Sequence, residues 1–585
     1  MGFLNSLVLL SLATTAELGY GTKHTKLFYH YPPDPVNVRT LNFFLPADQL
    51  SVPCFMSIEI KAAYNSYSGD SSIFGDKWTF NHNIRVRPNK NKFDVLEGDG
   101  FLNSYNREKN LVEAKAALID QLLVAKKKAD AQTGGLKATS VYDDYKKQLQ
   151  ISHSFLEEQE AKLLTPKPLG PGKYFSYSRG PSTLELKPDG SFVRSFQNGS
   201  SETFNKEGRI IKMSDRNGNY ISYNYQGDNL VRINDMCGRY VSFSYQMDPA
   251  LKGLVSSISD SINRELKYSF YPNRRLKSFV DLNKKTTTYV YDKTGNMTSV
   301  TPANPAEAFT LEYNDKFEVE KQKGPGKIET RYKRTFIAND ANHSISEITK
   351  FIDGKMESRE LQEYKTREFE TTTKFDRSGK EIKKEIRKLS AETGYPVSVL
   401  DEKGAGDLLV YDPSNGNLLK RQSIPSGESM EFVYDPHCNQ VTKMKVTLAS
   451  KATADTTFTF DERCNLKEAV ETQKGVKSVW ITLKYNPKGK IAFLTDNLAN
   501  KEVAFTYWQY GKPESITLKD VGTLLVKYLP TGEIEKVDTF PHGKSVARFK
   551  NQKKEDFQGP ILSEVRSALD SMLNYLRPAG LNIGL

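Results

Sequence analysis

The stretch that decides the fold is residues 208–300, which begins GRIIKMSDRNGNYISYNYQGDNLVRINDMCGRYVSFSY (208–245) and writes one short pattern four times. In each copy an apolar pair is followed by an Asp, a polar turn rich in Gly and Asn, and an alternating aromatic run. The runs end at Tyr225, Tyr245, Phe270 and Tyr291, at spacings of 20, 25 and 21 residues. A period in this range is typical of stacked repeats, so the sequence predicts a repeat array.

The same pattern returns in the second half of the chain. It is marked there by Tyr411-Asp412, Tyr434-Asp435, Phe460-Asp461, Tyr485, Tyr507 and Tyr528. Alternation with a period of two residues predicts antiparallel strands that bury one face. We interpret each Tyr as packing in a ladder of rings on the strands. Each Asp then caps the following turn by accepting from backbone N–H groups.

Two motifs carry a resemblance to a known family. The first is Y-D-x-x-G-N at 291–296, which contains Tyr291 and Asp292 and is echoed by D-R-N-G-N at 215–219. The second is YNSYSGDSSIFGDKWTFN at 64–81, which supplies Tyr64, Asn65, Phe74, Gly75 and Trp78. With these motifs the chain resembles the YD-repeat, or rearrangement-hotspot (Rhs), family over nearly all of its length after residue 40.

The resemblance implies an all-β fold, in which stacked antiparallel hairpins coil into a hollow shell. Within the upstream motif we expect Trp78 and Phe74 to form the core of an N-terminal head. Many Rhs proteins also carry an aspartyl self-cleavage motif and a variable toxin at the C-terminus. This chain has no D-P-x-G-x-x-x-G near its end, so self-cleavage and a toxin tail are not carried over to it.

Two stretches break the β pattern with helical periodicity. Apolar residues recur at helical spacing on both sides of Gly134-Gly135, which predicts an α-helical hairpin. Near the end a stripe that includes Leu562, Val565 and Leu569 predicts a helix with Ser563 as its N-cap. We therefore expect a signal peptide (1–20), a β head (25–105), a helical insert (106–165), a first repeat block (174–300), irregular long β-hairpins (301–390), a second repeat block (395–550) and a C-terminal helix acting as a plug (561–585).

Two of the four cysteines occupy equivalent positions in neighbouring repeats. Cys438 and Cys464 both fall where Y-D-x-x-G-N has its Gly, a turn position that favours positive φ. Neighbouring strands lie about 4.8 Å apart, and a disulfide needs Cα atoms roughly 4.4 to 6.8 Å apart. The sequence therefore predicts a Cys438–Cys464 disulfide in an oxidising compartment. The alternative is a pair of buried free thiols.

The sequence contains none of the common catalytic or metal-binding motifs. H-E-x-x-H, G-x-S-x-G, G-x-x-x-x-G-K-S/T and C-x-x-C are all missing, and the seven histidines are scattered. Asp215-x-Asn217-x-Asn219 is similar to the start of a calcium loop but lacks the later Gly and Glu. His437 beside Cys438 has no second ligand group at zinc spacing. We therefore expect no enzymatic activity, no cofactor and no metal.

Charge and the N-terminus bear on the compartment and the partners. The net charge of +12 is spread along the chain without a basic patch, so we expect no nucleic-acid partner. The apolar run at 4–13 is too short to span a membrane and predicts a secretory signal. No later segment is apolar enough to cross one. We expect a secreted, periplasmic or cell-surface protein.

The resemblance and the aromatic repeats leave two functions open. In the first, the scaffold binds cell-surface glycans or lipopolysaccharide and mediates contact with another cell. In the second, the shell encloses a separate toxin or effector polypeptide for delivery. Glycan hydrolysis by paired carboxylates remains a third hypothesis, which requires carboxyl groups about 5 to 9.5 Å apart across a cleft.

Overall fold

A computed structural model describes residues 36–107, 111–165, 169–176, 180–337, 340, 342–391, 394–412, 415–550, 553–574, 576, 579 and 581. The expected signal peptide and the first residues of the expected head lie outside this part of the chain. The described residues are dominated by one antiparallel sheet of 33 strands, from β9 (Gly172–Ser176) to β41 (Ile534–Pro541). The predicted all-β fold is confirmed.

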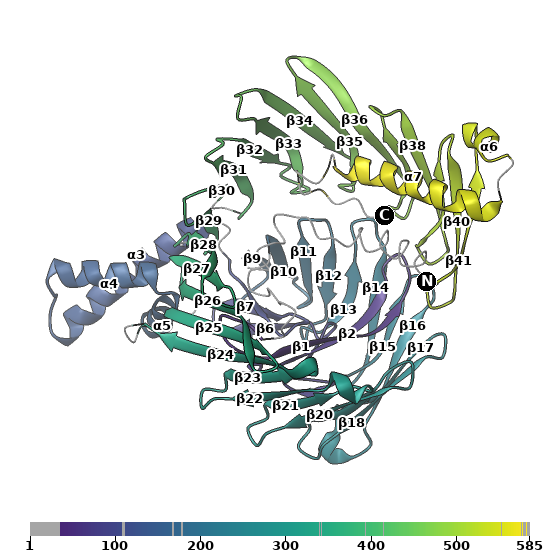
Figure 1. The fold of residues 1–585 in the computed structure, drawn as a ribbon. Helices are drawn as coiled ribbons and strands as arrows, with labels where there is room; N and C mark the ends of the chain where they lie inside the picture. The colour runs from purple at the N-terminus through teal and green to yellow at the C-terminus, as the bar shows by residue number, and fades with distance from the viewer. Residues whose placement is uncertain are drawn as a thin grey trace.

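The sheet is built in chain order. Each strand from β9 onward pairs with the next, and among the described residues no pairing register joins β41 to β9. Figure 1 shows the sheet coiling round, so that its last strands stand opposite its first ones. Short two-stranded units connected by tight turns explain this order, because antiparallel neighbours need only a few connecting residues.

The repeat turns owe their shape to the Asp that opens them. Asp235 Oδ1, at the end of β15 (Asn229–Asp235), accepts from the backbone N of Cys237 and of Arg239, both at 2.8 Å. The repeat tyrosines add a bond across strands. Tyr245 donates to the carbonyl of Leu230 at 2.8 Å, and the same bond recurs at Tyr313, Tyr434, Tyr485, Tyr507 and Tyr528. Each repeat is thus fixed to the strand before it as well as stacked on it.

A small head packs on one face of this sheet. It contains β1 (Phe44–Val52), β2 (Ile58–Asn65) and β5 (Trp78–Phe80) in one sheet, and β6 (Arg85–Asn89), β7 (Lys92–Leu96) and β8 (Leu102–Tyr105) in another. Phe74 and Trp78 are fully buried. Their rings contact Tyr268 and Tyr289 of the first repeat block, so the head and the block share one core.

A helical arm projects from the sheet (Figure 1). It has three helices rather than the two expected: α3 (Leu111–Thr133), α4 (Thr139–Ile151) and α5 (His153–Leu163). The extra break is at Ser152, which has extended backbone and caps α5 by accepting from Phe155 N at 3.2 Å. The arm has its own small core, in which Leu122 and Leu149 are completely buried.

The expected irregular hairpins belong to the same sheet as the repeats. They include β24 (Ile328–Phe336), β25 (His343–Ile352), β26 (Lys355–Lys365), β27 (Phe369–Phe375) and β28 (Glu381–Leu389). Two of these strands are 10 and 11 residues long, against five to seven for most strands of the first block.

The C-terminal helix α7 (Lys554–Asn574) lies across β38 (Lys501–Tyr507), β39 (Pro513–Leu518), β40 (Gly522–Tyr528) and β41. Its buried stripe includes Ile561, Val565 and Met572. The prediction that Ser563 is the N-cap is wrong, because the helix starts nine residues earlier and runs through Pro560. Among the described residues no helix is both long and apolar enough to cross a membrane.

Candidate functional site

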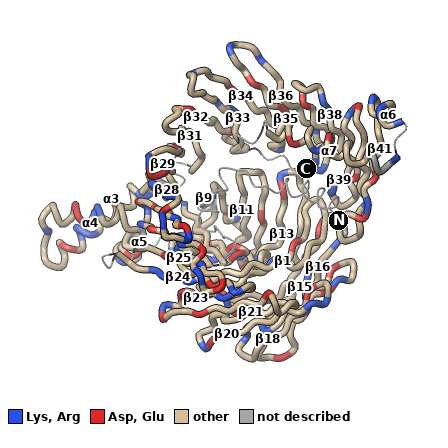
Figure 2. The backbone as a smooth tube through the Cα atoms, viewed as in Figure 1, with Lys and Arg blue, Asp and Glu red and all other residues tan. Residues whose placement is uncertain are grey.

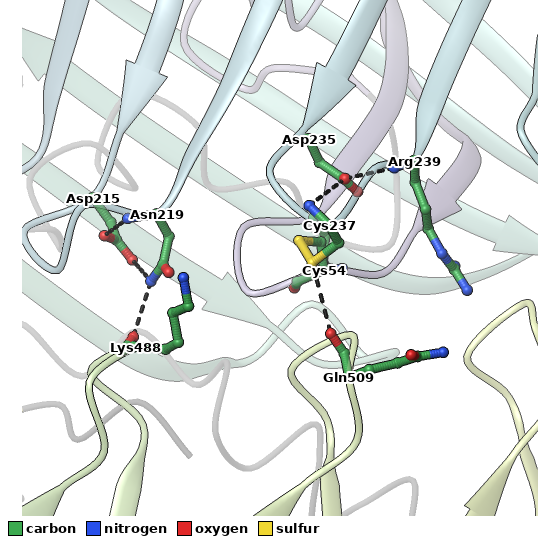
Figure 3. Close-up of a disulfide and its surroundings, with 9 residues drawn as sticks. Cys54, Asp215, Asn219, Asp235, Cys237, Arg239, Lys488 and Gln509 are labelled. Atoms are coloured by element: carbon green, nitrogen blue, oxygen red, sulfur yellow. Dashed lines mark hydrogen bonds between the residues drawn. A yellow bond between two sulfur atoms is a disulfide. The ribbon is translucent and has the colours of Figure 1, made fainter.

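The turns of the first repeat block meet the turns of the second along a line that we call the seam. It joins the turns at 197–239 to those at 439–532. Arg216 Nη1 donates to the carbonyl of Cys464 at 2.9 Å, and Asn219 Nδ2 donates to the carbonyl of Lys488 at 3.0 Å. Asn439 Nδ2 donates to Gln197 Oε1. Later turns of one block always meet later turns of the other, so the two rows of turns are in register (Figure 3).

The D-R-N-G-N turn shows how the sequence builds this contact. Asp215 Oδ1 accepts from the backbone N of Asn217 and Asn219 at 2.8 and 2.9 Å, which fixes the turn. The side chain of Asn217 then faces the second block and accepts from Asn465 Nδ2 at 3.0 Å. A Cβ on Gly489 would lie 2.0 Å from the Asn217 side chain, so this close approach requires glycine.

A disulfide that sequence reasoning missed ties the head to the seam. Cys54 and Cys237 are bonded, with their Cα atoms 6.0 Å apart, and Cys237 Sγ lies 3.8 Å from the carbonyl oxygen of Gln509 (Figure 3). Beside it the guanidinium of Arg239 stacks 3.4 Å above the ring of Tyr510. The chain has only four cysteines. Once Cys438 and Cys464 are paired, Cys54 and Cys237 are the two that remain.

The loop that carries Cys54 continues the seam past the turn at 235–239. Pro53 lies against Gly532 and Phe55 against Gly511, closely enough that a Cβ on either glycine would meet them within about 3 Å. Past the turn at 235–239 the head therefore supplies the contacts described here with the last two turns of the second block.

The structure also places Cys438 and Cys464 in a disulfide, with a Cα–Cα distance of 5.5 Å. The assignment of Cys438 to the glycine position is wrong, because positive φ falls on Asn439 there. The turn that opens at Asp435 closes on Gln440, one residue longer than the turn from Asp461 to Asn465. Cys464 does occupy the left-handed position, at φ +64°.

The other marker residues of the second block have local roles. Asp435 Oδ1 accepts from the backbone N of Cys438 at 2.7 Å, and Tyr434 donates to the carbonyl of Leu418 at 3.0 Å. Tyr411 packs its ring against Tyr395, with centroids 5.2 Å apart, and Asp412 accepts from Asn415 Nδ2 at 3.0 Å. These four residues shape the strands and turns rather than converging on a site.

The two motifs that carried the family resemblance lie against each other. Trp78 Nε1 donates to the hydroxyl of Tyr291 at 3.1 Å. The Tyr64 hydroxyl donates to Gly295 O and accepts from Met297 N, both at 3.0 Å. Burial raises the pKa of Tyr64 above its usual value, so the phenol stays neutral.

The neighbours of this contact hold it in place. Asp292 Oδ1 accepts from the backbone N of Asn296 at 2.9 Å, which closes the turn that receives Tyr64. Asn65 Oδ1 accepts from Asn42 Nδ2 at 2.7 Å and orients the end of β2. Gly75 has φ +95°, and a Cβ there would lie 2.4 Å from the carbonyl oxygen of Arg274. The signature is therefore a docking motif between the head and the repeats.

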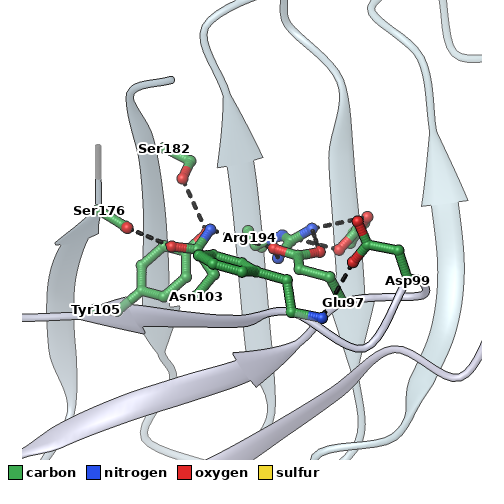
Figure 4. A network of polar contacts seen from close by, with 9 residues as sticks. Glu97, Asp99, Asn103, Tyr105, Ser176, Ser182 and Arg194 are labelled. Atoms are coloured by element: carbon green, nitrogen blue, oxygen red, sulfur yellow. Dashed lines mark hydrogen bonds and ion pairs between the residues drawn. The ribbon is translucent and has the colours of Figure 1, made fainter. Parts of the chain in front are cut away.

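A buried cluster of charges joins the other half of the head to the first strands of the sheet (Figure 4). Arg194 on β11 (Phe192–Phe196) is 3% exposed and makes a bidentate contact with Glu97 at 2.7 and 2.9 Å. The same guanidinium pairs with Glu202 on β12 (Ser201–Phe204) at 2.9 Å. Tyr105 is hydrogen-bonded to Ser182 at 2.8 Å.

The cluster holds two carboxyl groups against one guanidinium. Burial raises the pKa of Glu202 to about 7, and the nearby Arg194 charge opposes this shift without cancelling it. The Glu202 carboxyl therefore binds a proton more readily than an exposed glutamate does. Because all three side chains are buried and bonded to one another, the cluster has the geometry of a structural lock rather than a substrate site.

Within the described part of the chain, two groups of side chains have the spacing of metal ligands, and both include a disulfide. They are His437 with Cys438 and Cys464, and Asp235 with Cys54 and Cys237. A disulfide sulfur is not a thiolate and does not serve as a zinc ligand. While the two bonds stand, neither group has the donor set of a zinc site.

The comparisons with known proteins add little beyond the fold. A family model described as a domain of unknown function, DUF6531, matches residues 33–105, which correspond to the head. No curated protein matches the chain. One similar solved structure, a crystal structure of TcdB2-TccC3-TEV, is 9% identical with a TM-score of 0.37 over 83% of this chain and 34% of that one.

Two further solved structures are similar to parts of this chain. The Tc holotoxin pore of Photorhabdus luminescens with a mutated TccC3 is 9% identical, with a TM-score of 0.37 over 82% of this chain and 33% of that one. A porin-like protein from Bacteroides uniformis is 10% identical, with a TM-score of 0.11 over 51% of this chain and 91% of that one. The chain spans about a third of the Tc chains, and likenesses this weak carry no argument about activity.

Proposed function

We propose that the protein is a non-enzymatic shell whose coiled sheet encloses a separate polypeptide. The observation that carries this proposal is a change in the inner face, which we define as the face covered by the head and by α7. Where it is covered, this face is mainly apolar apart from the Glu97–Arg194–Glu202 cluster. Between the two covers, on β25 to β28, it is polar.

The pairing registers trace the change strand by strand. Tyr332 is buried in the core that includes the head, and directly opposite residues of paired strands share a face. The row that starts at Tyr332 continues through Ile348, Glu360 and Lys374. The next row on the same face is Arg334, Ser346, Gln362, Thr372 and Glu385. The apolar core resumes only at Leu418.

The charges on this polar wall are paired with one another. Lys374 lies 3.3 Å from Glu360, and Arg387 lies 2.6 Å from Glu385. Arg39 of the head reaches Glu370 at 3.3 Å and stacks on the ring of Tyr364. The wall therefore presents hydrogen-bonding groups and charges of both signs, which are interspersed around β24 to β28 (Figure 2). Such a surface suits an enclosed chain whose own peptide groups need partners.

Other observations agree with a secreted or envelope-associated scaffold. Disulfides persist in oxidising compartments, and this chain has two. The acid pair Glu97 and Glu202 is bridged by Arg194 and closed to solvent, which supports a structural rather than a hydrolytic role. The earlier resemblance to toxin-carrying Rhs proteins points the same way.

The test is mass spectrometry of whatever co-purifies with the protein from its native source, before and after added protease. We expect one stoichiometric polypeptide that survives protease while the shell is intact. A matched pair of variants locates the contact. Gln362→Leu with Thr372→Leu makes the inner face apolar, and Lys333→Leu with Glu347→Leu changes the opposite face of the same hairpins. Purification of an empty shell from the native source would contradict the proposal.

A second candidate is glycan binding at the seam. A pocket of about 490 Å³ there is lined by Asn217, Asp461, Arg463, Asn465 and Tyr485, among others. Amide, carboxylate and guanidinium groups beside an aromatic ring are the set that binds sugar hydroxyls. Retained glycan or lipopolysaccharide, lost in Asp461→Ala together with Arg463→Ala, would favour this role over encapsulation.

A further inference from the structure

Both disulfides of the protein lie at the seam, and together they use all four cysteines in the chain. Cys54–Cys237 fastens the head to a turn of the first block, next to Gln509 of the second. Cys438–Cys464 fastens two neighbouring turns of the second block. The strands that carry Cys438 and Cys464 are also held by backbone ladders, so neither disulfide joins the two rows of turns directly, and each acts by fixing the residues that meet there.

The non-covalent contacts across the seam are of a weaker kind than those ladders. They are side-chain bonds to carbonyls and amides, such as Arg216 to Cys464 and Asn219 to Lys488, together with the stacking of Arg239 on Tyr510. These bonds are separate from one another, so each can break without its neighbours. A strand pair, by contrast, is held by a row of bonds that break together. The seam is therefore the line along which the coil separates most easily.

Each disulfide holds in place residues that make contacts across the seam. The carbonyl that receives Arg216 belongs to Cys464 itself, so the bond to Cys438 fixes the acceptor. Cys237 stands two residues before Arg239, and Asp235 caps both. Cys54 holds the loop whose neighbours Pro53 and Phe55 fill the last part of the seam. Loss of either disulfide frees one side of several cross-seam contacts at once.

We propose that the seam is a thiol-controlled opening of the shell, closed by the two disulfides and released by a dithiol reductant. Attack begins at Cys237, which is partly exposed, whereas Cys54, Cys438 and Cys464 are each at most 6% exposed. A reductant thiolate bonds to Cys237 Sγ and expels the Cys54 thiolate, which takes up a proton. The second thiol of the reductant then closes its own disulfide and releases Cys237 as a thiol.

Two electrons pass from the dithiol to each protein disulfide, and each bond yields two protein thiols. The Cys438–Cys464 bond becomes accessible once the seam loosens, since Cys464 is covered by the first block through Arg216. The proposed opening rests only on the seam contacts and the two disulfides. It does not depend on whether the shell encloses a polypeptide.

Trypsin mapping tests this inference, because Arg216, Arg239, Arg463 and Lys488 all lie in seam turns. The folded protein is treated with dithiothreitol, alkylated and freed of reagents, and its thiols are counted by mass. Limited digestion is then compared with that of the untreated protein. We expect cleavage after the seam residues to accelerate at least tenfold. Cleavage should stay unchanged after Lys267, which is exposed on a strand, and after Lys474, which is exposed in the turn that follows β35 (Leu466–Gln473) at the end of that strand away from the seam.

Two double variants separate the opening from an effect of the alkyl groups. Cys54→Ser with Cys237→Ser removes one disulfide, and Cys438→Ser with Cys464→Gly removes the other. Glycine is chosen at 464 because it accepts the positive φ of that position. Each should show raised seam cleavage without reductant. Four alkylated thiols with unchanged seam cleavage would overturn the inference. Equal acceleration at Lys267 and Lys474 would overturn it too, because it means general unfolding.

Discussion

Arg216 Nη1 donates a 2.9 Å hydrogen bond to the backbone carbonyl of Cys464, 248 residues further along the chain. Both residues occupy repeat turns that are opened by an Asp, Asp215 in one and Asp461 in the other. One repeat therefore supplies the donor and another the acceptor, and the same turn design serves both edges of the coil. This part of the seam is therefore built from the repeat turns themselves.

Replacing Arg216 should loosen the seam locally. Hydrogen bonds from charged donors contribute about 1.5–3 kcal/mol, and Arg216→Ala loses the bond to Cys464. We expect faster amide hydrogen exchange in the 461–465 turn with the overall fold unchanged. Lys293→Ala is the matched control, because Lys293 holds the same position after the Asp of the Y-D-K-T-G-N turn and its side chain is exposed. Equal exchange in both variants would show that the bond does not hold the seam.

Gly75→Ala should weaken the attachment of the head. Its φ of +95° is unfavourable for any side chain, and its Cβ would lie 2.4 Å from the carbonyl of Arg274. Gly218→Ala has a similar φ of +81° but open space around it, so it isolates the conformational cost of roughly 1–3 kcal/mol. Urea denaturation should show a larger loss for Gly75→Ala. Equal losses of unfolding free energy in the two variants would show that the close contact of Gly75 with Arg274 adds no destabilisation.

Trp78→Ala should destabilise the head and the first block together. Trp78 is buried against Tyr64 and Tyr289, and removing a buried Trp or Phe costs about 3–5 kcal/mol. Phe74→Ala should behave alike, because Phe74 is equally buried. The control is Phe493→Ala, since the Phe493 side chain is largely exposed on its strand. Thermal melts that leave all three variants near wild type would show that the motif is a surface.

The stability of the protein should carry a pH-dependent contribution from Glu202. The pKa of its carboxyl is raised from 4.5 to about 7 in the fold, mainly by burial and with the charge of Arg194 opposing. The folded state then binds more protons than the unfolded state between these two values, so this contribution falls as pH rises toward 7 and is constant above it. The groups that face Glu202 are Arg194, Glu97, Tyr105 and Tyr223.

Glu202→Gln removes the titrating proton and keeps the shape of the side chain. The difference in unfolding free energy between wild type and variant should therefore change with pH below 7 and level off above it. Glu185→Gln, at a more exposed site on β10 (Ser182–Leu186), is the matched control. A difference that does not vary with pH would contradict a shifted pKa at Glu202.

Truncation before Lys554 should expose the inner face of the last strands. The helix α7 covers β38 to β41 with Ile561, Val565 and Met572, and its loss leaves a contiguous apolar surface. We expect aggregation, detected by size-exclusion chromatography with light scattering. Because the helix starts at 554, a cut at 562 leaves part of it in place and should aggregate less. A monodisperse protein lacking 554–585 would show that α7 is not a cover.

The sequence by itself determined the strands, the turns and the class of fold. Strict alternation, the Asp that caps each turn and the 20-to-25-residue period are local properties, and they predicted the sheet and its chain-order pairing. The Cys438–Cys464 pair was also predictable, because its partners lie in adjacent repeats. Local patterning was less able to place helix ends. Ser563 was predicted as an N-cap but lies inside α7, whereas Ser152, which the sequence pattern did not single out, caps α5.

Only the tertiary structure decided which distant turns meet. The curvature of 33 strands accumulates from small twists at every strand pair, and no single residue reports that sum. The Cys54–Cys237 bond, the contact of Arg216 with Cys464 and the Glu97–Arg194–Glu202 cluster all join segments far apart in sequence. Their partners depend on how far the coil has turned. The repeat pattern specifies each step of the coil, but the seam forms only where the completed coil brings its two rows of turns together.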